Sequence, residues 1–351
     1  MSLQQQPALE PEEAPAAAVG APVPAASAPA RARSSRSRLT LRRFARNRLA
    51  LVGIGLLVLL FLLAWVGPLV DKWGYDDLDF DSFLQSPSGN HWFGTDQAGS
   101  DLFAQTCRGL QKSLIIGILV GLIVTTLAAV TGACAGYFGG WVDRVIMWVV
   151  DLLLVMPSFL LIAVLSPVFQ GATWLIFVVL LAAFSWMITA RVIRSMTQTL
   201  KDREFVKAAK YLGVPTWKII GRHILPSMAS LLIIDAVIQV SVAIIGESGL
   251  SYFGFGIQPP DVSLGTVIAA GTSSATTYQW LFWFPAACLV MVGLAIAFIG
   301  DGLRDALDPN AAGARARIKK PRGGKAGSRT RKPSSGPTGV PAARTESLGA
   351  E

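Results

Sequence analysis

Six blocks of apolar residues, each close to the length that crosses a lipid bilayer, constrain this chain more than any other feature. A transmembrane helix needs about 20 consecutive, mostly apolar residues. Of the 351 residues, 52% are hydrophobic and 15% are charged, which excludes an ordinary soluble domain. We therefore predict an all-α integral membrane protein with spans at about residues 49–70, 114–136, 145–168, 174–190, 228–245 and 280–299.

The charges between the blocks predict how the spans are oriented. Eight arginines and no acid lie from Arg31 to Arg48, directly before the first span. Segment 71–112 carries seven Asp, whereas eight Lys or Arg and two acids occupy 191–223. Because cytoplasmic loops collect Lys and Arg, six spans with both termini in the cytoplasm fit every loop. This topology also explains the net charge of +9, so we expect the bilayer and no nucleic acid as a partner.

The two ends of the chain differ in composition from the apolar blocks. Residues 1–38 are rich in Ala and Pro and contain few large apolar side chains. Residues 311–351 are rich in Gly, Ser and Pro and carry ten Lys or Arg. Such compositions cannot bury enough apolar surface to fold. We predict two disordered cytoplasmic tails around a transmembrane domain at residues 39–310.

A polar, basic stretch from Glu204 to Pro226 separates the fourth and fifth predicted spans. Its first half predicts a short helix, because four apolar residues recur at helical spacing: Phe205, Ala208, Ala209 and Leu212. Gly213 suits the left-handed position that ends a helix, and Pro215 suits the start of the next one. The second helix would place Trp217, Ile220, Gly221 and Ile224 on one side. We expect two short amphipathic helices joined by a bend outside the lipid.

This stretch resembles the "EAA" coupling loop of bacterial ABC-importer permeases. The resemblance rests on Lys207-Ala208-Ala209, on Gly213 after three intervening residues and on Leu225-Pro226. It departs from the family at Lys207, where Glu is often found. In that family the loop, here residues 201–226, docks into a groove on the cytoplasmic ATPase. The resemblance implies coupling roles for Glu204, Phe205, Ala208, Ala209, Leu212, Gly213 and Pro226. The alternative is a merely basic cytoplasmic loop.

Two further strings resemble the C-type permeases of dipeptide, oligopeptide and nickel importers. The first, HWFGTDQAGSDLF, spans His91 to Phe103. Its Asp96 and Asp101 are candidate metal ligands, but we favour a capped, turn-rich extracellular loop. The second, ESGLSYFGFGIQPPDVSLG, spans Glu247 to Gly265, and its Gly and Pro residues predict a re-entrant or turning path at the outer surface. The resemblance implies the type I ABC-importer permease fold.

Two carboxylates fall inside predicted spans, where burying a charge is costly. Asp151 lies in the third span and Asp235 in the fifth. One interpretation places both on the translocation pathway, where Asp235 would meet a cationic substrate or a peptide amine. The other gives each a hydrogen bond or ion pair to a neighbouring helix, and we favour it for Asp151. The small residues of the second span, which include Gly117, Gly121 and Gly132, predict close helix contact.

No residue pattern points to catalysis, to a metal site or to a cofactor bound by this chain. The Gly324-Lys325-Ala326 step lacks the upstream Gly and the Ser or Thr of a nucleotide-binding loop. The three cysteines are far apart in sequence and lack metal-site spacing. We therefore expect a non-enzyme whose energy source is a partner protein.

The resemblance implies a permease subunit of an ATP-driven importer of di- or oligopeptides in the bacterial cytoplasmic membrane. Its implied partners are a homologous B-type permease, two ATPase subunits that use ATP and Mg, and an extracytoplasmic substrate-binding protein. One alternative is the same machinery importing nickel or another small solute. A secondary transporter driven by an ion gradient is a further alternative, but it would carry more intramembrane charges and an internal repeat.

Overall fold

The computed structural model describes residues 41–169 and 174–307. Within these ranges every regular element is helical, apart from two isolated β-bridges in the segment before α3. The tails predicted at 1–38 and 311–351, and the short loop expected around Gln170-Gly171, lie outside the described residues. Four helices are long and apolar enough to cross a membrane, and up to six spans result if each of two bent helix pairs counts as one.

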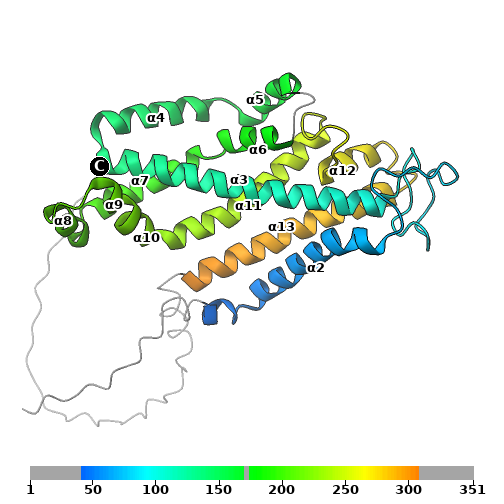
Figure 1. The fold of residues 1–351 in the computed structure, drawn as a ribbon, viewed down its shortest axis with the longest axis horizontal. Helices are drawn as coiled ribbons and strands as arrows, with labels where there is room; N and C mark the ends of the chain where they lie inside the picture. The colour runs from blue at the N-terminus through cyan, green and yellow to red at the C-terminus, as the bar shows by residue number, and fades with distance from the viewer. Residues whose placement is uncertain (1–40, 170–173, 308–351) are drawn as a thin grey trace, which may run out of the picture. The chain divides into compact units, whose positions relative to one another are not determined.

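The first and last long helices, α2 (Arg48–Val70) and α13 (Trp280–Leu307), pack against each other (Figure 1). The Asn47 side chain caps α2 by accepting a hydrogen bond from the Leu49 N–H at 3.1 Å. Gly53 permits close approach, since a Cβ there would lie 2.8 Å from the Ala295 carbonyl oxygen. α2 covers the first predicted span, and α13 extends eight residues beyond the predicted end at 299.

The central helix α3 (Leu102–Phe138) has 37 residues, about 55 Å at 1.5 Å per residue. It begins 12 residues before the predicted start of the second span, because Arg108 and Lys112 lie on the helix instead of ending it. α3 contacts α7 (Met187–Lys201) and α11 (Ala229–Tyr252) along its length (Figure 1).

Glycines on α3 account for this close packing. An added Cβ at Gly132 would lie 2.5 Å from the Ala190 carbonyl oxygen of α7. At Gly117 it would lie 2.4 Å from the Ile244 side chain of α11. The prediction that small residues of this span permit close helix contact is confirmed.

Neither the third nor the fourth predicted span is a single straight helix. α4 (Gly140–Val155) and α5 (Ser158–Leu165) meet at 79°, and the short η1 (Ser166–Phe169) follows. Pro157 causes the break, because it lacks an N–H and forces Met156 into an extended conformation (φ −81°, ψ 127°). α6 (Trp174–Ala183) and α7 meet at 46°.

Four short elements connect α7 to α11: α8 (Glu204–Tyr211), α9 (Thr216–Ile219), the π-helical turn η2 (Ile220–Ile224) and α10 (Leu225–Ser227). α11 then runs to Tyr252, seven residues past the predicted end at 245. The expectation that the outer loop begins at Glu247 is therefore wrong. A further helix, α12 (Leu264–Thr272), packs against α3, α11 and α13.

Candidate functional site

The bend between α8 and α9 is built by a specific helix end. Gly213 has φ +73°, and its N–H donates to the Lys210 carbonyl at 3.0 Å. The Val214 N–H donates to the Ala209 carbonyl at 3.1 Å, which completes a Schellman motif. No atom lies within 4 Å of a Cβ added at Gly213. The backbone conformation alone therefore favours Gly, and the predicted bend is confirmed.

We call residues Glu204–Ser227 the elbow. Its first helix presents two faces that differ in burial. Val206 and Ala209 are buried, whereas Phe205, Ala208 and Leu212 are exposed. The four residues predicted to share one apolar face fall on α8 and its C-cap, but only Ala209 of them packs inward, so most of that face is exposed. Tyr211, 88% exposed, and Leu212, 82% exposed, instead form an apolar outer face at the bend. Glu204 lies in the first turn of α8, where the helix dipole favours a carboxylate.

The second half of the elbow also has one buried and one exposed face. Three isoleucines are buried: Ile219, Ile220 and Ile224. The π-helical turn widens the inward face, so that Ile219 and Ile220 are both buried. Trp217 and Gly221, expected on the side of Ile220, are exposed instead, and the exposed fraction of Trp217 is 70%. Pro226 is exposed in the first turn of α10.

Asp235 on α11 joins three helices by hydrogen bonds. Its Oδ1 accepts from the Thr189 hydroxyl of α7 at 2.9 Å. Its Oδ2 accepts from the Thr125 hydroxyl of α3 at 3.2 Å. Gln239 Nε2 donates to the Thr189 hydroxyl oxygen at 3.1 Å. The half-buried carboxylate thus ties α11 to both helices that flank it.

The acids of α4 pair with the basic residues of α7. Asp151 is exposed and accepts a hydrogen bond from the Arg191 guanidinium. Eight residues earlier on α4, Asp143 accepts two hydrogen bonds from Arg194, one of them at 2.6 Å from Nη2. Such a bidentate pair fixes direction as well as distance. These pairs join α4 to the start of the cytoplasmic segment predicted at 191–223.

Sequence reasoning missed Glu247, a fully buried carboxylate on α11. Its oxygens accept from the Ser251 hydroxyl at 2.6 Å and from the Ser113 hydroxyl of α3 at 3.0 Å. The Ser113 oxygen accepts in turn from the Leu264 N–H at 3.3 Å, at the start of α12. Glu247 thus connects α3, α11 and α12. The Glu and Ser spaced four residues apart on one helix face were the available signal.

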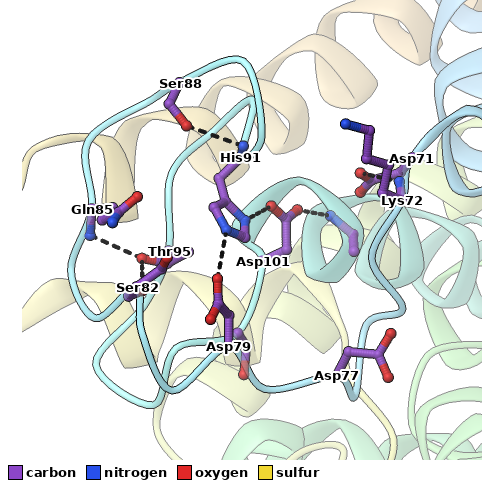
Figure 2. Close-up of polar contacts among 12 residues, drawn as sticks. Asp71, Lys72, Asp77, Asp79, Ser82, Gln85, Ser88, His91, Thr95 and Asp101 are labelled. Atoms are coloured by element: carbon purple, nitrogen blue, oxygen red, sulfur yellow. Dashed lines mark hydrogen bonds and ion pairs between the residues drawn. The ribbon is translucent and has the colours of Figure 1, made fainter.

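The segment between α2 and α3 folds around His91, whose side chain is buried (Figure 2). Its Nδ1 lies 2.7 Å from Asp101 Oδ2, and its Nε2 lies 3.4 Å from Asp79 Oδ2. Asp101 also caps α3, since its Oδ1 accepts from the Ala104 N–H at 2.8 Å. Thr95 accepts from the Gln85 N–H and donates to the Ser82 carbonyl. The Asp101 carboxylate therefore both pairs with His91 and caps α3.

The remaining residues of this string also shape turns. Asp96 Oδ1 accepts from the N–H groups of Ala98 and Ser100 at 2.8 and 2.9 Å. Gly94 and Gly99 have φ of +82° and +84°. A Cβ on Gly99 would also lie 2.3 Å from the Asp79 carbonyl oxygen. The prediction of a capped, turn-rich loop is confirmed.

The pKa values of two carboxyls in the segment between α2 and α3 are shifted in opposite directions. Hydrogen bonding by the Ser82 side chain and by the Asp81 N–H lowers the pKa of Asp79. Burial and the neighbouring Asp101 carboxylate raise the pKa of Asp71. Desolvation disfavours the ionised form, and donated hydrogen bonds favour it.

Comparison with known proteins shows the family to which the chain belongs. Residues 117–313, more than half of the chain, match the family described as binding-protein-dependent transport system inner membrane component. The chain belongs to this family. Residues 35–87 match the N-terminal transmembrane domain of oligopeptide transport permease C. The predicted resemblance to importer permeases is thereby confirmed.

Three relatives from different bacteria illustrate the similarity. The oligopeptide transport system permease protein OppC of Mycobacterium tuberculosis is 54% identical over 272 residues, 77% of this chain and 94% of the relative. A putative peptide permease protein of Brucella suis is 38% identical over 77% of this chain and 89% of the relative. OppC of Bacillus subtilis is 34% identical over 76% of this chain and 87% of the relative.

Proposed function

We propose that this chain is the C-type permease subunit of an ATP-driven importer of oligopeptides. The names of the Mycobacterium and Bacillus relatives support oligopeptides, and that of the Brucella relative supports peptides, over nickel. Membership in a binding-protein-dependent family supports an importer over a secondary transporter driven by an ion gradient.

We propose six spans in the bacterial cytoplasmic membrane, with both termini in the cytoplasm and a transmembrane domain at 39–310. Counting α4 with α5 and α6 with α7 as one broken span each supports this number. The Lys and Arg of the elbow and the Asp-rich outer segment support the orientation.

The observation that carries the proposal is the apolar outer face of the elbow. Tyr211, Leu212 and Trp217 are all at least 70% exposed, although a monomeric surface at the cytoplasmic side gains nothing from such side chains. Aromatic residues are enriched where proteins bind one another. This face suits the groove of a cytoplasmic ATPase, one of two that would use ATP and Mg.

The fold supplies a route from the elbow to the membrane helices. α8 follows α7 after two residues, and Met228 alone separates α10 from α11. α7 and α11 both pack on the glycines of α3, and Asp235 ties α11 to Thr189 of α7. A push on the elbow would therefore move α7 and α11 together. A homologous B-type permease would complete the pore, and an extracytoplasmic binding protein would deliver the peptide.

We assign the predicted elbow residues two kinds of role. Phe205, Ala208 and Leu212 contact the ATPase, with Glu204 in the first turn, whereas Ala209 seats α8 on the membrane domain. Gly213 sets the bend, and Pro226 starts the helix that leads into α11. For Asp235 and Asp151, the hydrogen bonds to Thr189, Thr125 and Arg191 support bracing of helices over contact with peptide.

Affinity purification of the tagged chain in mild detergent tests the proposal. We expect a second permease and ATPase subunits in the eluate, together with ATP hydrolysis. Leu212→Asp combined with Trp217→Asp should remove the ATPases and retain the second permease, because the charges would have to be desolvated in the groove. Phe80→Asp, an exposed aromatic of the outer segment, is the matched control and should retain every subunit. ATPases that remain bound to the double variant would contradict this assignment of the elbow.

A further inference from the structure

A hollow of about 320 Å³ lies between the end of α3 and the elbow. α3, α7 and α8 meet there at the same end of the helices (Figure 1). Its lining residues combine two aromatic rings with several polar groups: Tyr137, Phe138, Lys201, Asp202, Val206, Lys207, Lys210 and Thr216.

The hollow has an excess of positive charge. Lys201, Lys207 and Lys210 contribute three charges, and Asp202 is the one carboxylate in the lining. Within the described residues, none of the three lysines forms an ion pair. The Lys201 ammonium lies 5.7 Å from the centre of the Tyr137 ring, a cation–π arrangement. Three ammonium groups therefore line one cavity together with a single carboxylate, and none of them is ion-paired within the described residues.

The neighbouring residues suggest how deep the hollow lies relative to the bilayer. Tyr137 and Phe138 are the last residues of α3, a helix apolar enough to span a membrane. On α4, which follows directly, Trp141 and Trp148 are 77% and 65% exposed. Exposed tryptophans near the end of a span are typical of the headgroup region. The lysines therefore border the layer that contains lipid phosphates.

We propose that this hollow binds the phosphate-bearing headgroup of an anionic phospholipid of the cytoplasmic leaflet. Basic pockets at the cytoplasmic end of membrane helices suit such headgroups, and the aromatic wall suits the start of the acyl chains. The bound lipid would bridge the end of α3 and α8, and so hold the elbow at a fixed height. Lys207, where the sequence departs from the family triplet, supplies one of the three charges. The inference takes from the proposed function only that the elbow is cytoplasmic.

Lipid retention by the purified full-length complex tests the proposal. Wild-type protein in mild detergent is titrated with phosphatidylglycerol or with phosphatidylcholine, and bound lipid is counted by native mass spectrometry. We expect retained phosphatidylglycerol, and replacement of the three lysines by Gln should weaken it on the order of a hundredfold, since each lysine contributes about fivefold. Replacement of the same lysines by Arg should preserve binding, because Arg keeps the positive charge. This result would show that the site tolerates substitution. Inorganic phosphate is the competitor that distinguishes a headgroup from a free anion.

A matched control removes three positive charges from the elbow and the residue that precedes it. Arg203, Lys218 and Arg222 are exposed and do not line the hollow, so their replacement by Gln should leave lipid retention unchanged. Equal loss in both triple variants would reduce the effect to general surface charge and overturn the proposal. Displacement of phosphatidylglycerol by phosphate at equal concentration would make the site one for free anions. If replacement of the three lysines by Gln left lipid retention unchanged but lost the ATPases, the lysines would instead bind an acidic surface of a partner protein.

This outcome is separable from the proposed function. Failure of lipid binding with intact ATPase recovery would overturn only the lipid site. Absence of ATPases from the wild-type eluate would contradict the importer assignment, whatever lipid is bound.

Discussion

Replacing Glu247 by alanine removes the carboxylate that accepts hydrogen bonds from Ser113 and Ser251. Neither hydroxyl is free to turn away. The Ser113 oxygen already accepts from the Leu264 N–H, and the Ser251 oxygen accepts from the Ile257 N–H at 3.2 Å. Their protons therefore point at Glu247, which is 0% exposed.

The expected cost follows from this count of donors. A buried hydroxyl that loses its acceptor costs about 1–3 kcal/mol, so two cost about 2–6 kcal/mol in the free energy of unfolding. Glu247→Gln keeps one carbonyl oxygen and should cost only about 1–3 kcal/mol. The effect should also be local, because Ile257 and Leu264 lie at either end of the connection between α11 and α12.

Thermal unfolding of the assembled complex in one detergent measures the rank order, and hydrogen exchange of residues 253–264 measures the local effect. The midpoint should fall in the order wild type, Gln, Ala, with faster exchange in this segment. Asp81→Ala is the control, since Asp81 is exposed and lies outside the elbow. An Ala variant as stable as wild type, or less disturbed than Gln, would refute the reasoning.

Two further substitutions test the elbow and the helix braces. Gly213→Val places an L-residue at φ +73° at a cost of about 1–2 kcal/mol. Peptide uptake per ATP hydrolysed should therefore fall, while the amount of protein in the membrane stays unchanged. Gly213→Asn should cause a smaller fall in this ratio, because Asn tolerates positive φ better. Equal coupling in the two variants would show that the bend is not required. Asp235→Asn weakens one of two hydrogen bonds and should destabilise the complex by about 1 kcal/mol, with equal effects on uptake of cationic and anionic peptides. A loss confined to cationic peptides would instead place Asp235 on the pathway.

Hydropathy and turn chemistry were sufficient for the parts of the fold that depend on neighbouring residues. The first span and the glycine-ended bend were predictable because each requires a residue type at its own position: apolar side chains for lipid, and Gly for positive φ. The break after α4 was also encoded locally, by Pro157, but hydropathy does not register a bend within an apolar block.

The charged groups show where local reasoning failed. Arg108 and Lys112 suggested that the membrane helix starts later, yet Lys112 pairs with Asp261 at 2.8 Å and lies 4.7 Å from the Trp174 ring centre. The Gly and Pro residues of the 247–265 string predicted a loop, yet Glu247 lies on α11 and accepts a hydrogen bond from Ser113, 134 residues away. A charge can lie within a buried helix when distant donors satisfy it, and those donors are absent from the local sequence.

The amino-acid sequence by itself thus determined an all-helical membrane protein, its family resemblance and the position of the elbow, because apolar length, Gly and Pro act locally. The tertiary structure alone decided which side of the elbow is open: Ala209 packs inward, whereas Phe205, Ala208 and Leu212 do not. Helical spacing gives the angle between side chains but not the direction of the neighbouring helix. That direction comes from the packing of α3, α7 and α11, which depends on contacts between residues far apart in the chain.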